Sequence, residues 1–219
     1  DPVTFTESSR HELQHDNERY VPKHGDPTWD SEHYDLALDY SPESNRLIGK
    51  VTITARAVED IPSFALDLYE LRVRKITVDG KSPRKYVNRN SRLVVTAATP
   101  IRAGSQFSVV VSYAGSPQPM PGLDGEAGWE ELEEGAIVAA QPHGAPSWFP
   151  CNDRMSEKSS YAITVRTDAD YRAVANGDLV AHARQGSTET WSYRLDRPVA
   201  PYLATLQIGR YLPWPVSGS

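Results

Sequence analysis

The sequence is poor in cysteine and in long apolar runs. It holds one Cys among 219 residues, which excludes an internal disulfide framework. Its longest uninterrupted apolar run, residues 136–140, is five residues long, whereas a helix that spans a bilayer needs roughly 18. We therefore predict no membrane partner.

An excess of positive charge is also missing. The chain has 23 Lys and Arg against 29 Asp and Glu, which gives a formal net charge of −6. Because binding to phosphate backbones needs a basic surface, we predict no nucleic-acid partner. No cationic stretch is followed by an apolar one, so no signal peptide is visible. The sequence thus favours a cytoplasmic location, with export as the alternative if a signal was removed ahead of Asp1.

The clearest pattern in the sequence is the alternation typical of β-strands. Apolar and polar residues alternate with a period of two over residues 34–40, 107–113, 161–166 and 191–196, whereas no window of 11 residues shows a helical stripe. This pattern predicts an all-β fold. We expect a large antiparallel β-sandwich or saddle-shaped sheet of roughly ten to twelve strands.

Proline, glycine and charge divide the chain. Residues 1–30 lack a sustained apolar period and are predicted to form a polar N-terminal arm or linker. Residues 31–213 form the predicted β domain, and residues 214–219 begin a further linker. Residues 116–135 combine three Pro, four Gly and five Glu, a composition typical of a solvated loop.

Three local features are predicted inside the β domain. The apolar side changes parity between Leu71 and Val78, which predicts a bulge near Arg74. The pairs Asp79-Gly80 and Asn176-Gly177 are typical of two-residue hairpin turns.

The sequence contains one match to a known metal-binding motif. His11, Glu12 and His15 fit HExxH, which on a helix places two His on one face to bind zinc. The flanking residues are polar, so such a helix would have no face to bury. The downstream Glu that zinc aminopeptidases use would fall on Tyr34, which the first strand already requires. We interpret the motif as a chance match and predict no metal site in this chain.

The richest constellation is the segment 141–158, between two predicted strands. The three prolines and one glycine of this segment predict a loop whose backbone is irregular but fixed. Loops of this kind can position functional groups. Trp148 and Phe149 are predicted core anchors. Cys151 is interpreted as a packed thiol rather than a nucleophile, since no adjacent base is evident.

This segment resembles a signature of the aminopeptidase N family of zinc metallopeptidases, which includes the leukotriene hydrolases. The shared pattern is a Gln or Glu nine residues before a Pro, followed by Cys, Asp and Lys; here these are Gln141, Pro150, Cys151, Asp153 and Lys158. Residues 34–40, 173–180 and 198–211 resemble further stretches of the family's N-terminal domain, in the same order. Met155 stands where the family usually has Pro.

The resemblance implies a function. In the family, a separate catalytic domain holds zinc, and a zinc-bound water attacks the first peptide bond. The resemblance thus predicts a non-catalytic N-terminal domain that caps this site. By position, Gln141 would anchor the substrate's α-amine, with His143 as a possible neighbour. The predicted partners are the missing catalytic domain and the N-terminus of a peptide, and an exposed interdomain face could drive self-association.

Two alternatives stay open from the residues alone. A self-contained β-sandwich binding module would have the same composition and strand pattern, because fold does not imply function. A complete small zinc protease using His11 and His15 would instead bind stoichiometric metal.

Overall fold

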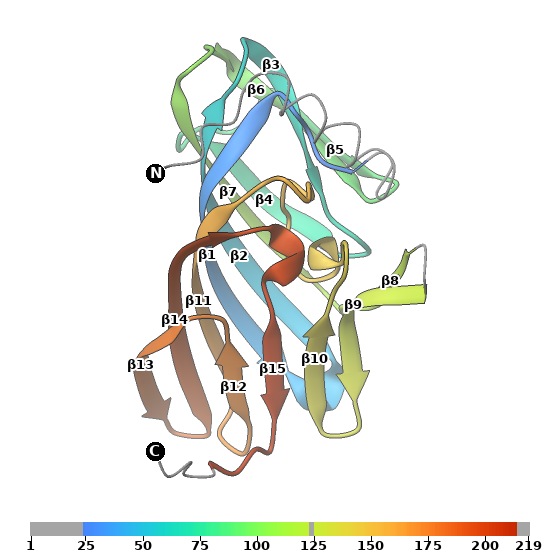
Figure 1. The fold of residues 1–219 in the computed structure, drawn as a ribbon, viewed down its shortest axis with the longest axis vertical. Coiled ribbons are helices and arrows are strands. Elements are labelled where there is room, and N and C mark those ends of the chain that lie inside the picture. Colours follow the sequence, from blue (N-terminus) through green and yellow to red (C-terminus); the bar gives the residue numbers. More distant parts are fainter. Residues whose placement is uncertain (1–23, 123–124, 214–219) are drawn as a thin grey trace, which may run out of the picture.

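The computed structural model describes residues 24–122 and 125–213, and these are almost entirely β (Figure 1). They form fifteen strands in three sheets and three 3-10 turns: η1 (Pro42–Ser44), η2 (Ala145–Ser147) and η3 (Pro201–Leu203). The predicted all-β class is confirmed. The strands outnumber the ten to twelve expected, because strands of four or five residues are too short to show an alternation.

A seven-stranded sheet forms the back of the molecule, in the order β13-β14-β11-β1-β2-β7-β4. In chain order its strands are β1 (Trp29–Ser41), β2 (Arg46–Ala57), β4 (Arg72–Val78), β7 (Gln106–Gly115), β11 (Ser159–Asp168), β13 (Asp178–Gln185) and β14 (Thr188–Val199).

One pair in this sheet departs from the predicted antiparallel arrangement. β1 pairs with β11 in parallel, with His33 opposite Ser160 and Asp39 opposite Arg166. The other pairs of the sheet are antiparallel. A parallel pair needs a long crossover connection instead of a hairpin. Here the crossover contains the whole three-stranded sheet and the strands β8, β9 and β10 of the five-stranded one, which is why alternation within single strands could not reveal it.

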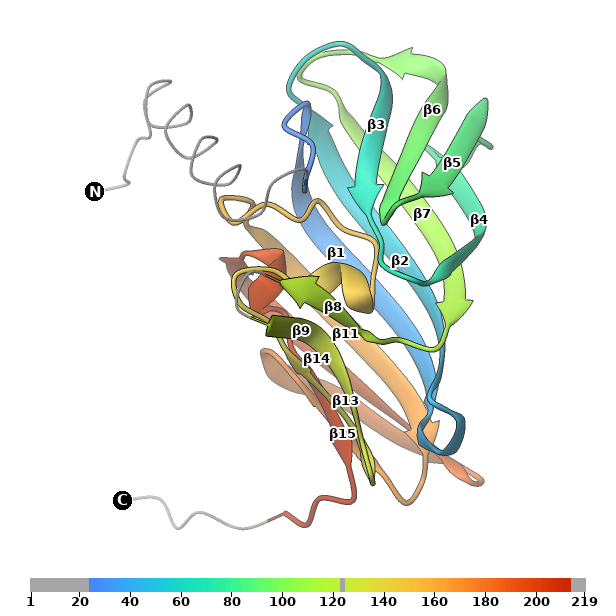
Figure 2. The same cartoon turned by 90° about the vertical axis from the view of Figure 1, so that its right-hand side faces the viewer.

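A five-stranded sheet has the order β12-β15-β10-β9-β8, and Figure 2 shows its strands β9 and β15 to the left of β2 and β7 of the large sheet. Its strands are β8 (Pro119–Gly122), β9 (Gly125–Leu132), β10 (Gly135–Ala139), β12 (Arg172–Ala175) and β15 (Leu206–Gly209). The rings of Tyr40 on β1 and Trp129 on β9 meet edge to face, with centroids 4.9 Å apart. This contact joins the two sheets.

The predicted solvated loop over residues 116–135 is wrong. Residues 119–122 and 125–132 are the strands β8 and β9, and β9 pairs with β10 through Val138 opposite Trp129. The glutamates of β9 face solvent while Trp129 is buried. A single large apolar residue thus holds this strand, and the surrounding Gly and Glu hide it in the sequence.

A three-stranded sheet, β3-β6-β5, stands above the large sheet in Figure 1. It consists of β3 (Ile61–Asp67), β5 (Lys85–Arg89) and β6 (Arg92–Ile101). Phe64 of β3 packs against Phe107 of β7, with ring centroids 5.5 Å apart. The small sheet therefore shares the core of the large one.

Two of the three local predictions are confirmed. The register between β4 and β7 shifts between Val73 and Lys75, which is the bulge predicted near Arg74. Asp79 and Gly80 both have positive φ and connect Val78 to Lys81, which bond each other as a two-residue turn requires. The turn is confirmed as an isolated bridge, because the strands β4 and β5 on either side of it belong to different sheets. Asn176-Gly177 also turns the chain, but it joins β12 to β13, which lie in different sheets. The hairpin predicted there is wrong, since each strand finds its partner elsewhere.

Candidate functional site

The predicted site segment runs from the end of β10 to the start of β11 and crosses the centre of the molecule (Figure 1). Its first residue, Gln141, has an exposed side chain, whereas His143 is only 4% exposed. From His143 to Asp153 all residues are buried. The segment therefore offers one accessible amide at its start and a packed body behind it. We call residues 141–158 the site loop.

A 3-10 turn and a hydroxyl pin the first half of the site loop to β9. Ser147 donates its hydroxyl to the Gly144 carbonyl at 2.6 Å and accepts the backbone N–H of Trp129 at 2.9 Å. Gly144 has φ 140°, and a Cβ at that position would lie 2.8 Å from the Gly128 nitrogen. Glycine is required there because the two backbones touch.

Aromatic residues anchor the middle of the loop. Trp148 and Phe149 are fully buried, as predicted. Phe149 meets the rings of Tyr34 and Tyr161 edge to face, at 5.5 and 6.5 Å between centroids. The Tyr113 hydroxyl donates to the Trp148 carbonyl at 2.9 Å. The loop backbone is thus fixed from both β1 and β7.

Cys151 follows these anchors and is fully buried. Its backbone pairs with that of Asp67 through bonds of 2.8 and 3.1 Å. Burial, reinforced by the charges of Asp153 and Asp67, raises the pKa of the Cys151 thiol well above its usual value. A thiol that stays protonated is a poor nucleophile, so the packed-thiol interpretation is confirmed.

Asn152 ties the site loop to the segment that precedes β1. Its side-chain amide donates to the carbonyls of Asp26 and Trp29, both at 3.0 Å, and its amide oxygen accepts the N–H of Asp26 at 2.8 Å. Residues 24–30, the described part of the predicted N-terminal arm, are therefore packed against the site loop. β1 itself begins at Trp29.

A cluster of charged side chains continues this junction. His24 Nδ1 lies 2.6 Å from Asp153 Oδ2, and Arg92 lies 3.3 Å from Asp67 Oδ1. Asp67 Oδ2 accepts the N–H groups of Gly25 and Asp153 at 2.7 and 3.1 Å. Burial and the nearby Asp153 charge raise the pKa of Asp67 to about 6. Burial, the largest single cause, lowers the pKa of His24, but the bond to Asp153 and the charges of Asp153 and Asp67 together outweigh it, so that pKa is raised.

His143 lies against this cluster but does not join it by a hydrogen bond through Nδ1. Its ring centroid is 5.5 Å from that of His24, and Nδ1 has no partner among the described residues. Burial is the main cause that lowers the pKa of His143. The structure therefore places the two predicted site residues differently: Gln141 faces solvent, and His143 is packed beneath.

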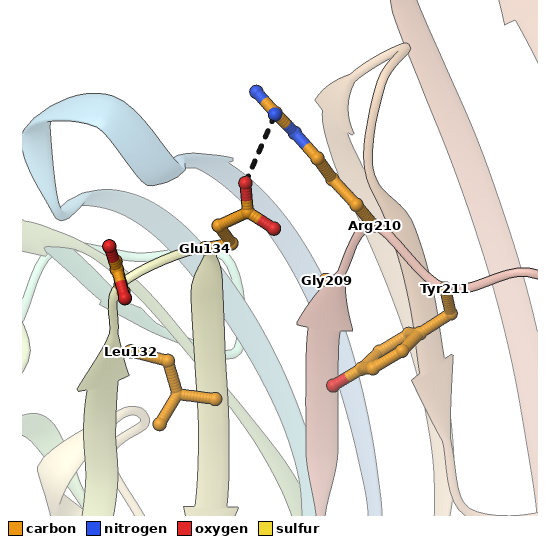
Figure 3. A pocket seen from close by; sticks show the side chains of 6 residues that line it. Leu132, Glu134, Gly209, Arg210 and Tyr211 are labelled. Atoms are coloured by element: carbon orange, nitrogen blue, oxygen red, sulfur yellow. Dashed lines mark hydrogen bonds and ion pairs between the residues drawn. The ribbon is translucent and has the colours of Figure 1, made fainter.

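One surface depression lies elsewhere. It is shallow and lined by the β9–β10 turn and the segment after β15: Leu132, Glu133, Glu134, Gly209, Arg210 and Tyr211 (Figure 3). Arg210 bonds Glu134 at 3.2 Å across it. Neither Gln141 nor His143 lines the depression.

The described residues contain no candidate metal-binding site. Residues 24–122 and 125–213 contain no group of three or more His, Cys, Asp and Glu side chains that could hold a metal ion. The motif at His11, Glu12 and His15 lies outside the described residues. No helix in the described ranges has the length and apolarity to cross a membrane.

Sequence comparison decides the family. The profile of the Peptidase M1 N-terminal domain matches residues 30–203. The chain belongs to this family. The M1 N-terminal domain described here therefore contains the site loop inside its matched range, together with nearly every strand.

The similarity of this chain to solved structures and to named proteins is consistent with the family assignment. An M1 zinc metallopeptidase from Deinococcus radiodurans superposes with a TM-score of 0.82 at 29% identity, over 87% of this chain and 44% of that protein. Endoplasmic reticulum aminopeptidase 1 of Mus musculus is 25% identical over 161 residues, and that of Homo sapiens 23%. The aligned part is 68% of this chain and 17% of those proteins. The chain thus spans less than half the length of these relatives.

Sequence reasoning missed the residues that hold the site loop. His24, Asp67 and Arg92 lie far from it along the chain, and their own neighbourhoods carry no motif. The family signature includes Asp153 but does not predict its partner, His24. The paired backbones of Asp67 and Cys151 and the bonds of Gly25 and Asp26 to Asp67 and Asn152 bring these groups together.

Proposed function

We propose that this domain is the non-catalytic N-terminal part of a zinc aminopeptidase and that it caps the active site of the parent enzyme. In this proposal, the Gln141 side-chain oxygen accepts a hydrogen bond from the α-ammonium group of a peptide substrate. Requiring a free amine at this point restricts cleavage to the first residue.

The observation that carries the proposal is the contrast within the site loop. Gln141 is exposed, while residues 143–153 behind it are buried and bonded to β1, β7 and β9. A binding group is most effective when its support is rigid, because less conformational freedom is lost on binding. An amide oxygen can accept from an ammonium group, and such a charge-assisted bond is worth about 1.5–3 kcal/mol.

Relatives support a peptide substrate and a zinc cofactor in the parent enzyme. The Deinococcus radiodurans protein is named a zinc metallopeptidase, and a mutant of it was crystallised with a Tyr-Ser-Ala substrate. In the parent enzyme, zinc would activate the attacking water. Since no group of the described residues fits a metal ion, we assign its ligands to the catalytic domain and derive no step through zinc here.

The decisive experiment measures the parent enzyme with Gln141 replaced. For Gln141→Ala we expect kcat/KM on aminoacyl substrates to fall by about tenfold to a hundredfold, which corresponds to the loss of one charge-assisted bond. For Gln141→Glu we expect tighter binding of the amine and a lower KM, because a carboxylate adds a second charge. Gln118→Ala, at another exposed glutamine, is the matched control. Unchanged kinetics in Gln141→Ala would refute the anchor role.

The isolated chain tests the non-catalytic role. We expect no hydrolysis of an aminoacyl chromogenic substrate in the presence of zinc. Turnover that is lost in His11→Ala would contradict this and favour a small zinc protease.

Self-association through an exposed interdomain face is the further expectation, and a strictly monomeric chain in analytical ultracentrifugation would count against it. The compartment stays a prediction: the sequence favours the cytoplasm, whereas the curated relatives are named for the endoplasmic reticulum.

A further inference from the structure

Positive charge is concentrated in one segment of this acidic chain. Eight of the 23 Lys and Arg residues fall within residues 72–92, which contain a single carboxylate, Asp79. The Asp79 carboxylate already accepts the backbone N–H of Ser108 at 2.8 Å. The segment comprises β4, the turn at Asp79-Gly80, and β5 up to the first residue of β6.

Most of these cations have no carboxylate partner in the described ranges. Arg92 pairs with Asp67. The other seven are exposed, and the structure records no ion pair for any of them; they are Arg72, Arg74, Lys75, Lys81, Arg84, Lys85 and Arg89. Unpaired cations at this density attract anionic groups over distances of about 10 Å at moderate salt.

The strand register arranges part of this charge around an apolar pair. In the β5–β6 ladder, Val87 lies opposite Val94, and Lys85 and Arg89 lie two residues to either side of Val87. Residues that alternate along a strand share a face, so these four side chains project from the same side of the small sheet. Val87 and Val94 are both 42% exposed. The face therefore offers an apolar strip between cations.

β5 is also an open edge. Among the strands that the structure describes, β5 pairs with β6 alone and ends the three-stranded sheet. In an antiparallel pair every second residue directs its N–H and C=O away from the neighbouring strand, which leaves backbone groups of β5 facing outward. Asn88 of β5 donates to the carbonyl of Leu71 at 3.2 Å, which holds this edge beside the start of β4.

The edge lies away from the proposed substrate anchor. Figure 2 shows β4 and β5 on one side of the molecule and the five-stranded sheet with β8, β9 and β15 on the other. Gln141 follows β10 of that second sheet. The two surfaces are therefore separate, and a ligand at the β5 edge would bind independently of the proposed function.

We propose that β5 binds an extended acidic segment of another protein, which adds to the three-stranded sheet as a fourth strand beside β5. The partner's backbone pairs with the outward N–H and C=O groups of β5, as in other strand-addition complexes. Its acidic side chains meet Lys85 and Arg89, and its apolar side chains cover Val87 and Val94. A nucleic acid would satisfy the cations but leave the backbone groups and the apolar strip without partners.

The test uses the 219-residue chain and a labelled peptide of about twelve residues in which every second residue is in turn Glu and Val, with Thr between them, so that Glu and Val share one face of the added strand. Binding is followed by fluorescence anisotropy at low salt. We expect saturable binding that weakens by at least about tenfold in the double variant Lys85→Glu/Arg89→Glu, since two attractive contacts become repulsive. A peptide of the same charge with Pro at alternate positions should bind at least about tenfold more weakly, because Pro cannot donate to a ladder.

The matched control is Lys50→Glu/Arg197→Glu, which reverses two exposed cations on the large sheet and leaves the net charge equal to that of the first variant. We expect it to bind the peptide nearly as the unaltered chain does. Equal weakening in both variants would overturn the proposal, as would equal affinity for the Pro-containing peptide. Stronger binding of a single-stranded oligonucleotide than of the acidic peptide would also overturn it. Circular dichroism of each variant confirms that the sheets are intact.

Discussion

Two segments that each follow a short strand of the five-stranded sheet are held in opposite ways. The site loop follows β10, has almost no regular structure, and is buried from His143 to Asp153. β13 follows β12, is a regular strand of eight residues, and is exposed along its whole length. Among the described strands β13 pairs with β14 alone, and its side chains His182 and Arg184 form ion pairs with Glu189 of that same strand. The comparison shows that burial does not follow regular secondary structure here, because the irregular segment packs on several strands and the regular strand on one.

The largest expected effect is at the aromatic anchor of the site loop. Phe149→Ala removes a fully buried ring that contacts Tyr34 and Tyr161. We expect the free energy of unfolding to fall by about 3–5 kcal/mol, because a cavity remains that its neighbours cannot fill. Chemical denaturation followed by tryptophan fluorescence measures this. A loss below about 1 kcal/mol would show that the loop is less tightly packed than the structure indicates.

The next effect concerns the link between the site loop and residues 24–29. Asn152→Ala removes three buried side-chain hydrogen bonds and leaves the groups of Asp26 and Trp29 without partners. We expect a destabilisation of about 2–4 kcal/mol in thermal or urea unfolding. Asn88→Ala, which removes one bond at an exposed position, is the control and should cost less than about 1 kcal/mol. Equal losses would contradict the central role assigned to Asn152.

The third prediction concerns pH. Burial, with the nearby Asp30 charge, raises the pKa of Glu157 to about 7 from its ordinary 4.5. The fold therefore favours the neutral carboxyl, so the stability that Glu157 contributes is complete below pH 4.5 and is lost as pH rises through 7. We expect the unfolding free energy to fall by up to about 3 kcal/mol over this range through Glu157.

Glu157→Gln should flatten this dependence, because the amide cannot ionise and its oxygen can still accept the Ser31 N–H that Glu157 binds at 2.7 Å. Glu43→Gln, at an exposed position, should leave the slope unchanged. Urea titrations at several pH values between 4 and 8 provide the measurement. The raised pKa values of Asp67 and His24 act in the same direction, whereas the lowered pKa of His143 acts against them, so a residual slope is expected.

The smallest effect is expected in β13. Val180 is 59% exposed and its strand packs on no second layer of the described structure. Val180→Thr keeps the β-branched shape and should change the unfolding free energy by less than about 0.5 kcal/mol. A larger loss in differential scanning calorimetry would indicate that this strand is covered in solution, for example by a second copy of the chain.

The sequence predicts those parts of the fold that depend on a pattern among residues close together in the chain. The alternation around Tyr34 and Ile163 identifies central strands, and the parity change at Arg74 identifies the bulge. Strands β8 and β9 escape prediction because each buries a single large apolar residue, Met120 and Trp129, among prolines, glycines and glutamates. The parallel pairing of β1 with β11 escapes it as well, since no local pattern records which strand will become a neighbour.

The candidate site divides in the same way. The position of Gln141 and the anchoring role of Trp148 and Phe149 follow from the motif around them. The supports of the loop do not, because Asp67 and His24 reach it from 86 and 129 residues away along the chain. Buried polar groups form hydrogen bonds with groups that are close in space but distant in sequence. Such partners can be identified only once the topology is known.

The parallel pair also constrains the order in which the chain can be assembled. His33 of β1 and Ser160 of β11 are 127 residues apart and bond through their side chains at 2.7 Å. During synthesis, β1 can pair with β2 almost at once, but its second neighbour, β11, emerges only after the strands β3 to β10 have been made. Until then, the middle strand of the finished domain is an unpaired edge. Contacts of such long sequence separation slow folding, so a nascent chain stalled before residue 159 should expose this edge to chaperones and to other nascent chains.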